Sequence, residues 1–89
     1  MAYRVRFTHS AENAFAALPQ PVRIRIEIAL ENYAADPFRR HDIRKVKGCP
    51  PGKPRYRLRV GEYRVTFRIL QQHLVVCVVA VGKKKNFEY

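Results

Sequence analysis

The chain has 89 residues, enough for one domain with a modest core, and hydrophobic residues make up 47% of it, as in globular proteins. Its formal net charge of +11 points to a nucleic acid or an acidic protein as partner. Cys49 and Cys77 have no metal-ligand spacing, and the longest apolar run, 74–81, is far too short to span a membrane. The N-terminus lacks the apolar core of a signal peptide, so we expect a cytoplasmic protein with a single domain over residues 1–89.

The positive charge is concentrated in the second half of the chain. Residues 1–43 carry six Lys or Arg against five Asp or Glu, whereas residues 44–89 carry twelve against two. We therefore expect the first half to act as scaffold and the second half to carry the binding surface.

The first half predicts a strand followed by two helices. Residues 3–8 alternate between polar and apolar, as in a half-buried strand. Ser10 is the expected N-cap of a short helix that ends before Pro19. Residues 22–33 are ambiguous. Val22, Ile24 and Ile26 alternate as in a strand, but Val22, Ile26, Leu30 and Tyr33 would also lie along one apolar side of a helix. We favour a helix of about fourteen residues, since Pro21 suits a first helical position and Pro37 would end it.

Residues 36–54 are rich in proline and glycine, so we expect a connecting loop with no regular element. Ile43 and Val46 are expected to contact the core. The basic side chains of the segment should project outward: Arg39, Arg40, Arg44, Lys45 and Lys47. A solvated basic loop and a phosphate-binding loop are both compatible with this composition.

Residues 55–70 predict a β-hairpin with chemically opposite faces. If Gly61 and Glu62 form a two-residue turn, the cross-strand pairs follow by counting outward from it. One face is apolar, with Val60 facing Tyr63, Leu58 facing Val65 and Tyr56 facing Phe67.

The second face of this hairpin carries five arginines. Arg59 faces Arg64, Arg57 faces Thr66 and Arg55 faces Arg68, although like charges in opposed positions are destabilising. A surface built for solubility mixes both signs of charge. We therefore expect this face to bind a polyanion, because the planar guanidinium group suits phosphate.

The chain ends with a second turn at Gln71 and Gln72, then residues 74–81, an apolar run expected to form a strand covered on both faces. The element order predicts an α+β fold: a mainly antiparallel sheet of about four strands, β-α-α-β-β-β, with two N-terminal helices packed on one face. The apolar side of the hairpin would lie under the helices.

The sequence contains none of the common metal or catalytic motifs. His9, His41 and His73 are scattered, and there is no HExxH, CxxC, carboxylate cluster or glycine-rich phosphate loop. We expect no metal and no cofactor, and a site made of cations with a phenol or an amine available for proton transfer.

Three blocks, Tyr56–Phe67, Lys45–Gly48 and the Val79–Lys84 segment with Tyr89, resemble the RelE/ParE superfamily of toxin-antitoxin toxins, and most closely its RelE branch. The resemblance implies a RelE-like fold and a ribosome-dependent endoribonuclease (mRNA interferase) that cuts messenger RNA in the ribosomal A site. It further implies a metal-independent attack of a ribose 2′-hydroxyl on its own phosphodiester. A cognate RelB-like antitoxin would hold the toxin inactive in a hetero-oligomer.

By the same resemblance, Arg64 matches the phosphate-stabilising arginine of the family. The remaining catalytic positions implied are Arg57, Arg59, Lys84 and Tyr89, and the other basic residues expected to contact RNA or the ribosome are Lys45, Lys47, Arg55, Arg68, Lys83 and Lys85. Arginine effectively cannot lose its proton, which leaves Tyr89 or Lys84 as candidate general bases.

Two other functions remain open from the sequence. One is a ParE-like toxin that shares the fold and inhibits DNA gyrase by binding, without nuclease activity. The other is a non-enzymatic RNA- or ribosome-binding module, which explains the charge but not the concentration of arginine on one sheet face.

Overall fold

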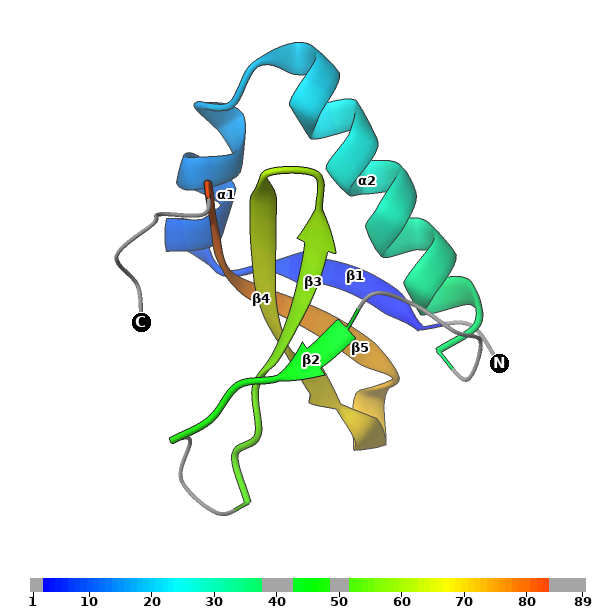
Figure 1. Ribbon diagram of the computed structural model, residues 1–89. Helices are drawn as coiled ribbons and strands as arrows, with labels where there is room; N and C mark the ends of the chain where they lie inside the picture. Colours follow the sequence, from blue (N-terminus) through cyan, green and yellow to red (C-terminus); the bar gives the residue numbers. More distant parts are fainter. Residues whose placement is uncertain (1–2, 38–42, 49–51, 84–89) are drawn as a thin grey trace.

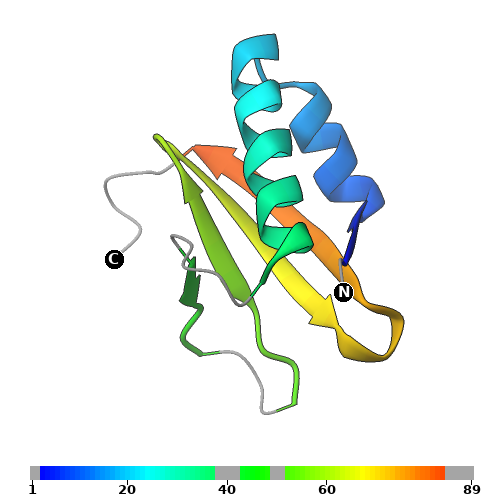
Figure 2. The ribbon, with the colours of Figure 1, turned by 90° about the vertical axis from the view of Figure 1, so that its right-hand side faces the viewer.

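A computed structural model describes residues 3–37, 43–48 and 52–83 of the chain. In this part, two helices pack on one side of a five-stranded sheet, and the other side of the sheet carries no helix (Figures 1 and 2). The α+β class and the placement of the helices are confirmed, but the sheet has one strand more than the sequence predicted. None of the helices in these residues is long and apolar enough to cross a membrane.

The elements follow the chain in the order β1 (Arg4–Phe7), α1 (His9–Ala16), α2 (Gln20–Ala35), β2 (Ile43–Lys45), β3 (Tyr56–Val60), β4 (Tyr63–Leu70), a 3-10 turn (Gln71–His73) and β5 (Val75–Lys83). The strand order is β1-β5-β4-β3-β2. Strand β1 is parallel to β5, and the other neighbours are antiparallel.

Helix α1 begins two residues earlier than the sequence suggested. Its N-cap is Thr8, whose Oγ1 accepts a hydrogen bond of 3.2 Å from the backbone N–H of Ala11. The prediction of Ser10 as N-cap was therefore wrong: Ser10 lies inside the helix, because Thr8 has the extended backbone that a capping residue needs.

Helix α2 settles the ambiguous segment in favour of a helix. It buries Ile26, Leu30 and Tyr33 against the sheet and leaves Ile24 and Ile28 about half exposed. The residues of the strand-like alternation therefore lie on different sides of the helix, and only the 3.6-residue period matches the burial. Pro21 occupies the second helical position, one residue later than predicted.

The core lies between the helices and the sheet. Phe67 and Val65 of β4 and Val76 and Val78 of β5 are fully buried there. The Phe67 ring lies 5.1 Å from the ring of Tyr33, centre to centre. Burial raises the pKa of the Tyr33 phenol, and the neighbouring Tyr56 and Tyr3 raise it further.

The hairpin has the predicted register. Tyr56 pairs with Phe67, Leu58 with Val65 and Val60 with Tyr63, and Gly61 has a φ of +59° in the turn. The predicted pairing of Arg55 with Arg68 is not part of this ladder, because β3 begins at Tyr56.

Strand β2 corrects the prediction of a loop without regular structure. Ile43 pairs with Leu58 and packs against the core, and Arg44 pairs with Arg57. The preceding residues 38–42 and the following residues 49–51 lie outside the described part, so nothing tests the predictions for Arg39 and Arg40. Arg44, Lys45 and Lys47 are exposed, as expected.

Strand β5 lies inside the sheet, between β1 and β4, but is covered on both faces only in its first half. Val75 and Val76 are buried, whereas Ala80 and Gly82 are exposed. The register against β4 shifts between Thr66 and Phe67, so that Phe67 faces Val78 and Thr66 faces Ala80. The bulge leaves Val79 out of the pairing with β4, so buried and exposed side chains do not alternate strictly along β5.

Candidate functional site

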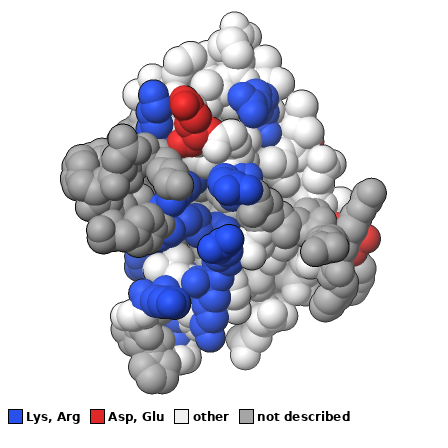
Figure 3. Space-filling model, viewed as in Figure 1, with Lys and Arg blue, Asp and Glu red and all other residues white. Residues whose placement is uncertain are grey.

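The face of the sheet turned away from the helices carries the arginines. Leu58 and Val65 point into the core, so their strand neighbours Arg57, Arg59 and Arg64 point to the opposite, open face. None of the five strands, as the structure describes them, contains an Asp or a Glu. Lys and Arg side chains gather over the hairpin, and the acidic side chains visible in the same view lie at the margin of this cluster or apart from it (Figure 3).

A pocket of about 200 Å³ opens among these arginines. Its lining residues come from three adjacent strands: Arg57, Arg64, Thr66, Ala80, Val81, Gly82 and Lys83. Two of the four residues that β5 contributes, Ala80 and Gly82, have little or no side chain, and a Cβ placed on Gly82 would meet nothing within 4 Å. The pocket forms because the long side chains of Arg57 and Arg64 lie beside Ala80 and Gly82, which fill little space.

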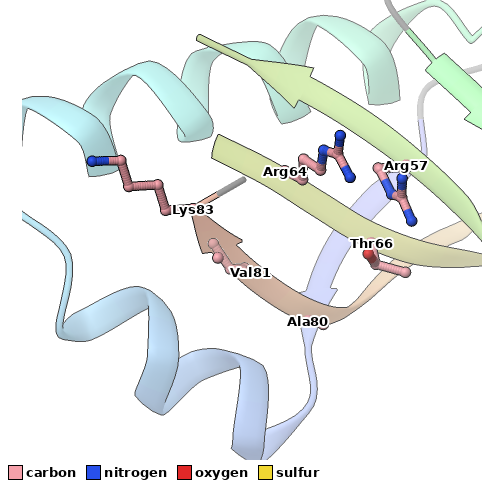
Figure 4. A pocket seen from close by; sticks show the side chains of 7 residues that line it. Arg57, Arg64, Thr66, Ala80, Val81 and Lys83 are labelled. Atoms are coloured by element: carbon pink, nitrogen blue, oxygen red, sulfur yellow. The ribbon is translucent and has the colours of Figure 1, made fainter. Parts of the chain in front are cut away.

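The side chains of Arg57 and Arg64 lie close to each other in this pocket, whereas that of Lys83 leads away from them (Figure 4). Lys83 Nζ instead lies 3.7 Å from Glu62 Oε2, and both side chains are largely exposed. Such an exposed pair contributes little to stability. Lys83 therefore helps to form the pocket wall but does not add its charge to the arginine pair.

A second hollow, of about 490 Å³, adjoins the first. It is lined by Val46, Gly48, Lys53, Arg55, Arg57, Thr66 and Arg68, and therefore shares Arg57 and Thr66 with the pocket. Although Arg55 and Arg68 are not ladder partners, both line this hollow. The two hollows together form a continuous cationic surface over β3, β4 and the end of β5.

The structure brings together some of the predicted catalytic residues. Arg57 and Arg64 share the pocket, and Arg59 faces Arg64 across the ladder but does not line the pocket. Lys84 and Tyr89, as well as Lys85, lie outside the described residues. Among the predicted RNA-binding residues, Lys45 pairs with Tyr56 and Lys47 is exposed, and neither lines a hollow.

Sequence reasoning missed three contributors to this surface. Thr66 lines both hollows, Lys53 lines the second, and Gly82 leaves space in the first. The place of Thr66 opposite Arg57 could be read from the hairpin register. That of Gly82 could not, because it depends on the pairing of β4 with β5 across the bulge.

The histidines and possible metal ligands form no cluster in the described residues. On α1, His9 Nε2 lies 3.4 Å from Asn13 Nδ2. His73 is exposed at the end of the 3-10 turn, and His41 lies outside the described part. No group of three or more His, Cys, Asp or Glu in the described residues is placed to hold a metal ion.

Comparison with solved structures places the fold among toxins. The chain superimposes on RelE of the RelE-RelB complex from Pyrococcus horikoshii with a TM-score of 0.77 and 24% identity, covering 97% of this chain and 99% of that one. Against a chain of the toxin-antitoxin complex RelBE2 from Mycobacterium tuberculosis, the TM-score is 0.75 and the identity 26%, and the match covers 94% of this chain and 100% of that one. Against the isolated E. coli RelE toxin, the TM-score is 0.74 and the identity 26%, and the match covers 98% of this chain and 89% of that one.

Comparison of the sequence alone gives the family. No curated protein sequence matches the chain. The model of the family described as ParE toxin of type II toxin-antitoxin system, parDE, matches residues 5–86. Because this match spans both helices and all five strands except the first residue of β1, the chain belongs to the ParE toxin family of type II toxin-antitoxin systems, within the RelE/ParE superfamily.

Proposed function

We propose that this toxin is a ribosome-dependent endoribonuclease that cuts messenger RNA in the ribosomal A site. The observation that carries the proposal is the pocket in which Arg57 and Arg64 lie side by side, on a sheet face whose strands contain no carboxylate. The RelE toxins among the similar structures support the choice of branch.

The reaction proposed is an internal transfer at phosphorus. The 2′-hydroxyl oxygen of the ribose attacks the adjacent phosphorus, the bond to the 5′-oxygen of the next nucleotide breaks, and a 2′,3′-cyclic phosphate results. The attacking hydroxyl loses its proton and the leaving 5′-oxygen gains one. Charge accumulates on the non-bridging oxygens meanwhile, and fixed donors aimed at such charge give a large part of catalysis in many enzymes.

Arg64 and Arg57 are the proposed donors to those oxygens. A guanidinium can donate two parallel hydrogen bonds to one phosphate, which also fixes its orientation. Arg59, which faces Arg64, would add positive potential at the rim of the pocket. Lys84 and Tyr89 remain proposed for proton transfer, by the resemblance to the family alone, and no metal ion takes part in the proposed scheme.

An antitoxin is the proposed partner of this toxin. The similar structure from Mycobacterium tuberculosis is described as a toxin-antitoxin complex. A RelB-like protein with an acidic or amphipathic segment would complement the cationic face and inhibit the toxin by occupying it. We further propose that residues 1–89 act as a single domain in the cytoplasm, where messenger RNA is translated.

The family match gives a reason to keep a second function in view. The matching model is named for ParE toxins. A ParE-like toxin that inhibits DNA gyrase by binding would need no catalytic groups. The two functions predict opposite results in two assays. New 5′ ends within A-site codons on translating ribosomes indicate the nuclease, whereas inhibition of gyrase supercoiling with intact message indicates the binding toxin.

The Arg64→Ala variant tests the proposed site directly. We expect the rate of message cleavage to fall about 100-fold or more, as for the loss of one donor to a developing oxyanion, while ribosome binding is retained. Arg64→Lys keeps the charge but loses the forked donor, so it should recover only part of the rate. Arg23→Gln is the matched control, because it removes one positive charge from α2 and Arg23 lines neither hollow. Equal cleavage by Arg64→Ala and the wild type would remove Arg64 from the mechanism.

A further inference from the structure

The cationic surface does not end at the hairpin, because it continues across β5 to the opposite edge of the sheet. Arg68 of β4 faces Cys77 of β5, and Cys77 faces Arg6 of β1. Neighbouring strands lie about 4.8 Å apart, so the Cα atoms of the two arginines are on the order of 10 Å apart across one small residue. Arg4, next along β1, faces Val75.

These arginines point to the same open face as the cleavage pocket. Val5 and Phe7 pack against the core, so Arg4 and Arg6, which alternate with them, point the other way. Both are exposed. On β4 the buried Phe67 and the half-buried Ile69 fix Arg68 on the open face by the same alternation.

Arg68 also connects this row to the pocket. It lines the larger hollow, and that hollow shares Arg57 and Thr66 with the pocket of Arg64. A chain of phosphates could therefore run from the pocket through the hollow to Cys77 and on to β1 without meeting a carboxylate of the strands.

We propose that Arg68, Arg6 and Arg4 form a second phosphate-binding strip, which holds the backbone of the substrate RNA beyond the nucleotide that is cut. The proposal rests on the proposed RNA-cleaving function for the identity of the ligand. Continuity with the cleavage pocket favours the substrate strand as occupant over a separate acidic protein. Small side chains along β5, Cys77 and Ala80 among them, leave room for a strand to lie across the sheet.

The other explanation for Arg4 and Arg6 is protection of a sheet edge. Charged side chains on an edge strand prevent pairing with another chain, and a charge of either sign serves this purpose. Reversal of the charge therefore separates the two explanations. Arg6→Glu should weaken RNA binding more than Arg6→Ala if the strip binds phosphate, and both should bind like the wild type if Arg6 only protects the edge.

Cys77 provides a probe at the centre of the strip. The experiment uses full-length protein with Cys49→Ser and two RNAs with 2′-O-methyl groups, which lack the attacking hydroxyl: a trinucleotide sized for the pocket and a dodecamer. The rate at which N-ethylmaleimide alkylates Cys77 is followed by mass spectrometry. We expect the saturating dodecamer to slow alkylation several-fold and the trinucleotide to leave it nearly unchanged.

Binding measurements test the arginines themselves. For single strands, each phosphate contact contributes about 0.7 to the slope of log K against log salt. Arg6→Ala and Arg68→Ala should each reduce the dodecamer slope by about 0.7 and leave the trinucleotide slope unchanged, whereas Arg6→Lys should restore it. Arg23→Gln, which removes an equal charge from α2 at a residue that lines neither hollow, should leave both slopes unchanged.

Failure of the strip and failure of the proposed function give different results. Unchanged Cys77 alkylation with the dodecamer, together with Arg64-dependent cleavage, would overturn the strip alone. Weaker ribosome binding by Arg6→Ala without weaker dodecamer binding would also overturn it, because the strip would then contact something other than the substrate strand. Protection of Cys77 in a protein that cuts no message would support the strip and contradict the nuclease.

Discussion

The guanidinium of Arg25 lies directly against Gly61. A Cβ built on Gly61 would come within 2.9 Å of Arg25 Nη2 and 3.4 Å of its Cζ. One side chain of helix α2 therefore reaches the turn between β3 and β4. The turn that sets the register of the two arginine-bearing strands thus depends on a residue without a side chain.

Gly61→Ala should destabilise the fold by about 1–2 kcal/mol, because φ is +59° there and an L residue with a Cβ is strained in that region. Gly61→Asn should cost less, since asparagine tolerates this conformation better. Urea unfolding measures both. The end of the Arg25 side chain can move, so the double variant Arg25→Ala/Gly61→Ala should lose about as much as Gly61→Ala. A double variant as stable as the wild type would show that the contact, and not φ, dominates.

Thr8→Ala should cost about 1 kcal/mol of unfolding free energy, because it removes the side-chain oxygen that caps α1. Ser10→Ala is the matched control within the same turn, and it should be neutral or slightly stabilising, since alanine is the better helix former. Chemical denaturation of the two variants checks this. A larger loss for Ser10→Ala would contradict the assignment of the cap to Thr8.

Ile26→Ala should destabilise the protein by about 2–5 kcal/mol, whereas Ile28→Ala should change its stability by no more than about 0.5 kcal/mol. The reason is burial: Ile26 is 0% exposed and Ile28 is 53% exposed, although they are two residues apart. Thermal or urea unfolding distinguishes them. Similar losses at the two positions would indicate a different orientation of α2.

Stability should fall at alkaline pH through Tyr33. The pKa of its phenol is raised above the ordinary value of 10.0 in the folded state, chiefly by burial. Below that value the phenol is neutral in both states. As the pH rises further, the unfolded chain loses the proton first, so unfolding becomes more favourable until the folded pKa is passed.

The measurement is the free energy of unfolding against pH for the wild type and Tyr33→Phe. Tyr33→Phe should show a smaller loss of stability above pH 10 than the wild type, whatever the lysines contribute to both. Parallel curves for the two proteins would mean that Tyr33 ionises equally in the folded and unfolded states.

The hairpin was predictable because its information is local. A two-residue turn with a glycine fixes which residues face each other, and the alternation of apolar and polar residues fixes which face is buried. The pairs of Arg59 with Arg64 and Arg57 with Thr66 follow from these two rules, and both are present in the structure. The same rules do not say where the ladder ends, so the pair of Arg55 with Arg68 was wrongly predicted.

Strand β2 could not be read from its own residues. It has only three, Ile43–Lys45, between segments rich in proline and glycine, and its strand character comes from pairing with β3. The prediction of the N-cap of α1 failed for a similar reason. Thr8 and Ser10 are both good capping residues, and the choice between them depends on the backbone conformation after β1.

By itself, the amino-acid order determined the two faces of the hairpin and the family, and it favoured a helix over a strand for α2, since each depends on residues near one another in the chain or on a sequence pattern. Only the tertiary structure decided that β1 lies parallel to β5, that the bulge at Val79 sets Ala80 opposite Thr66, and that Arg6 and Arg68 face the same cysteine. Pairings between distant strands are selected by how the whole core packs, and no local rule encodes them.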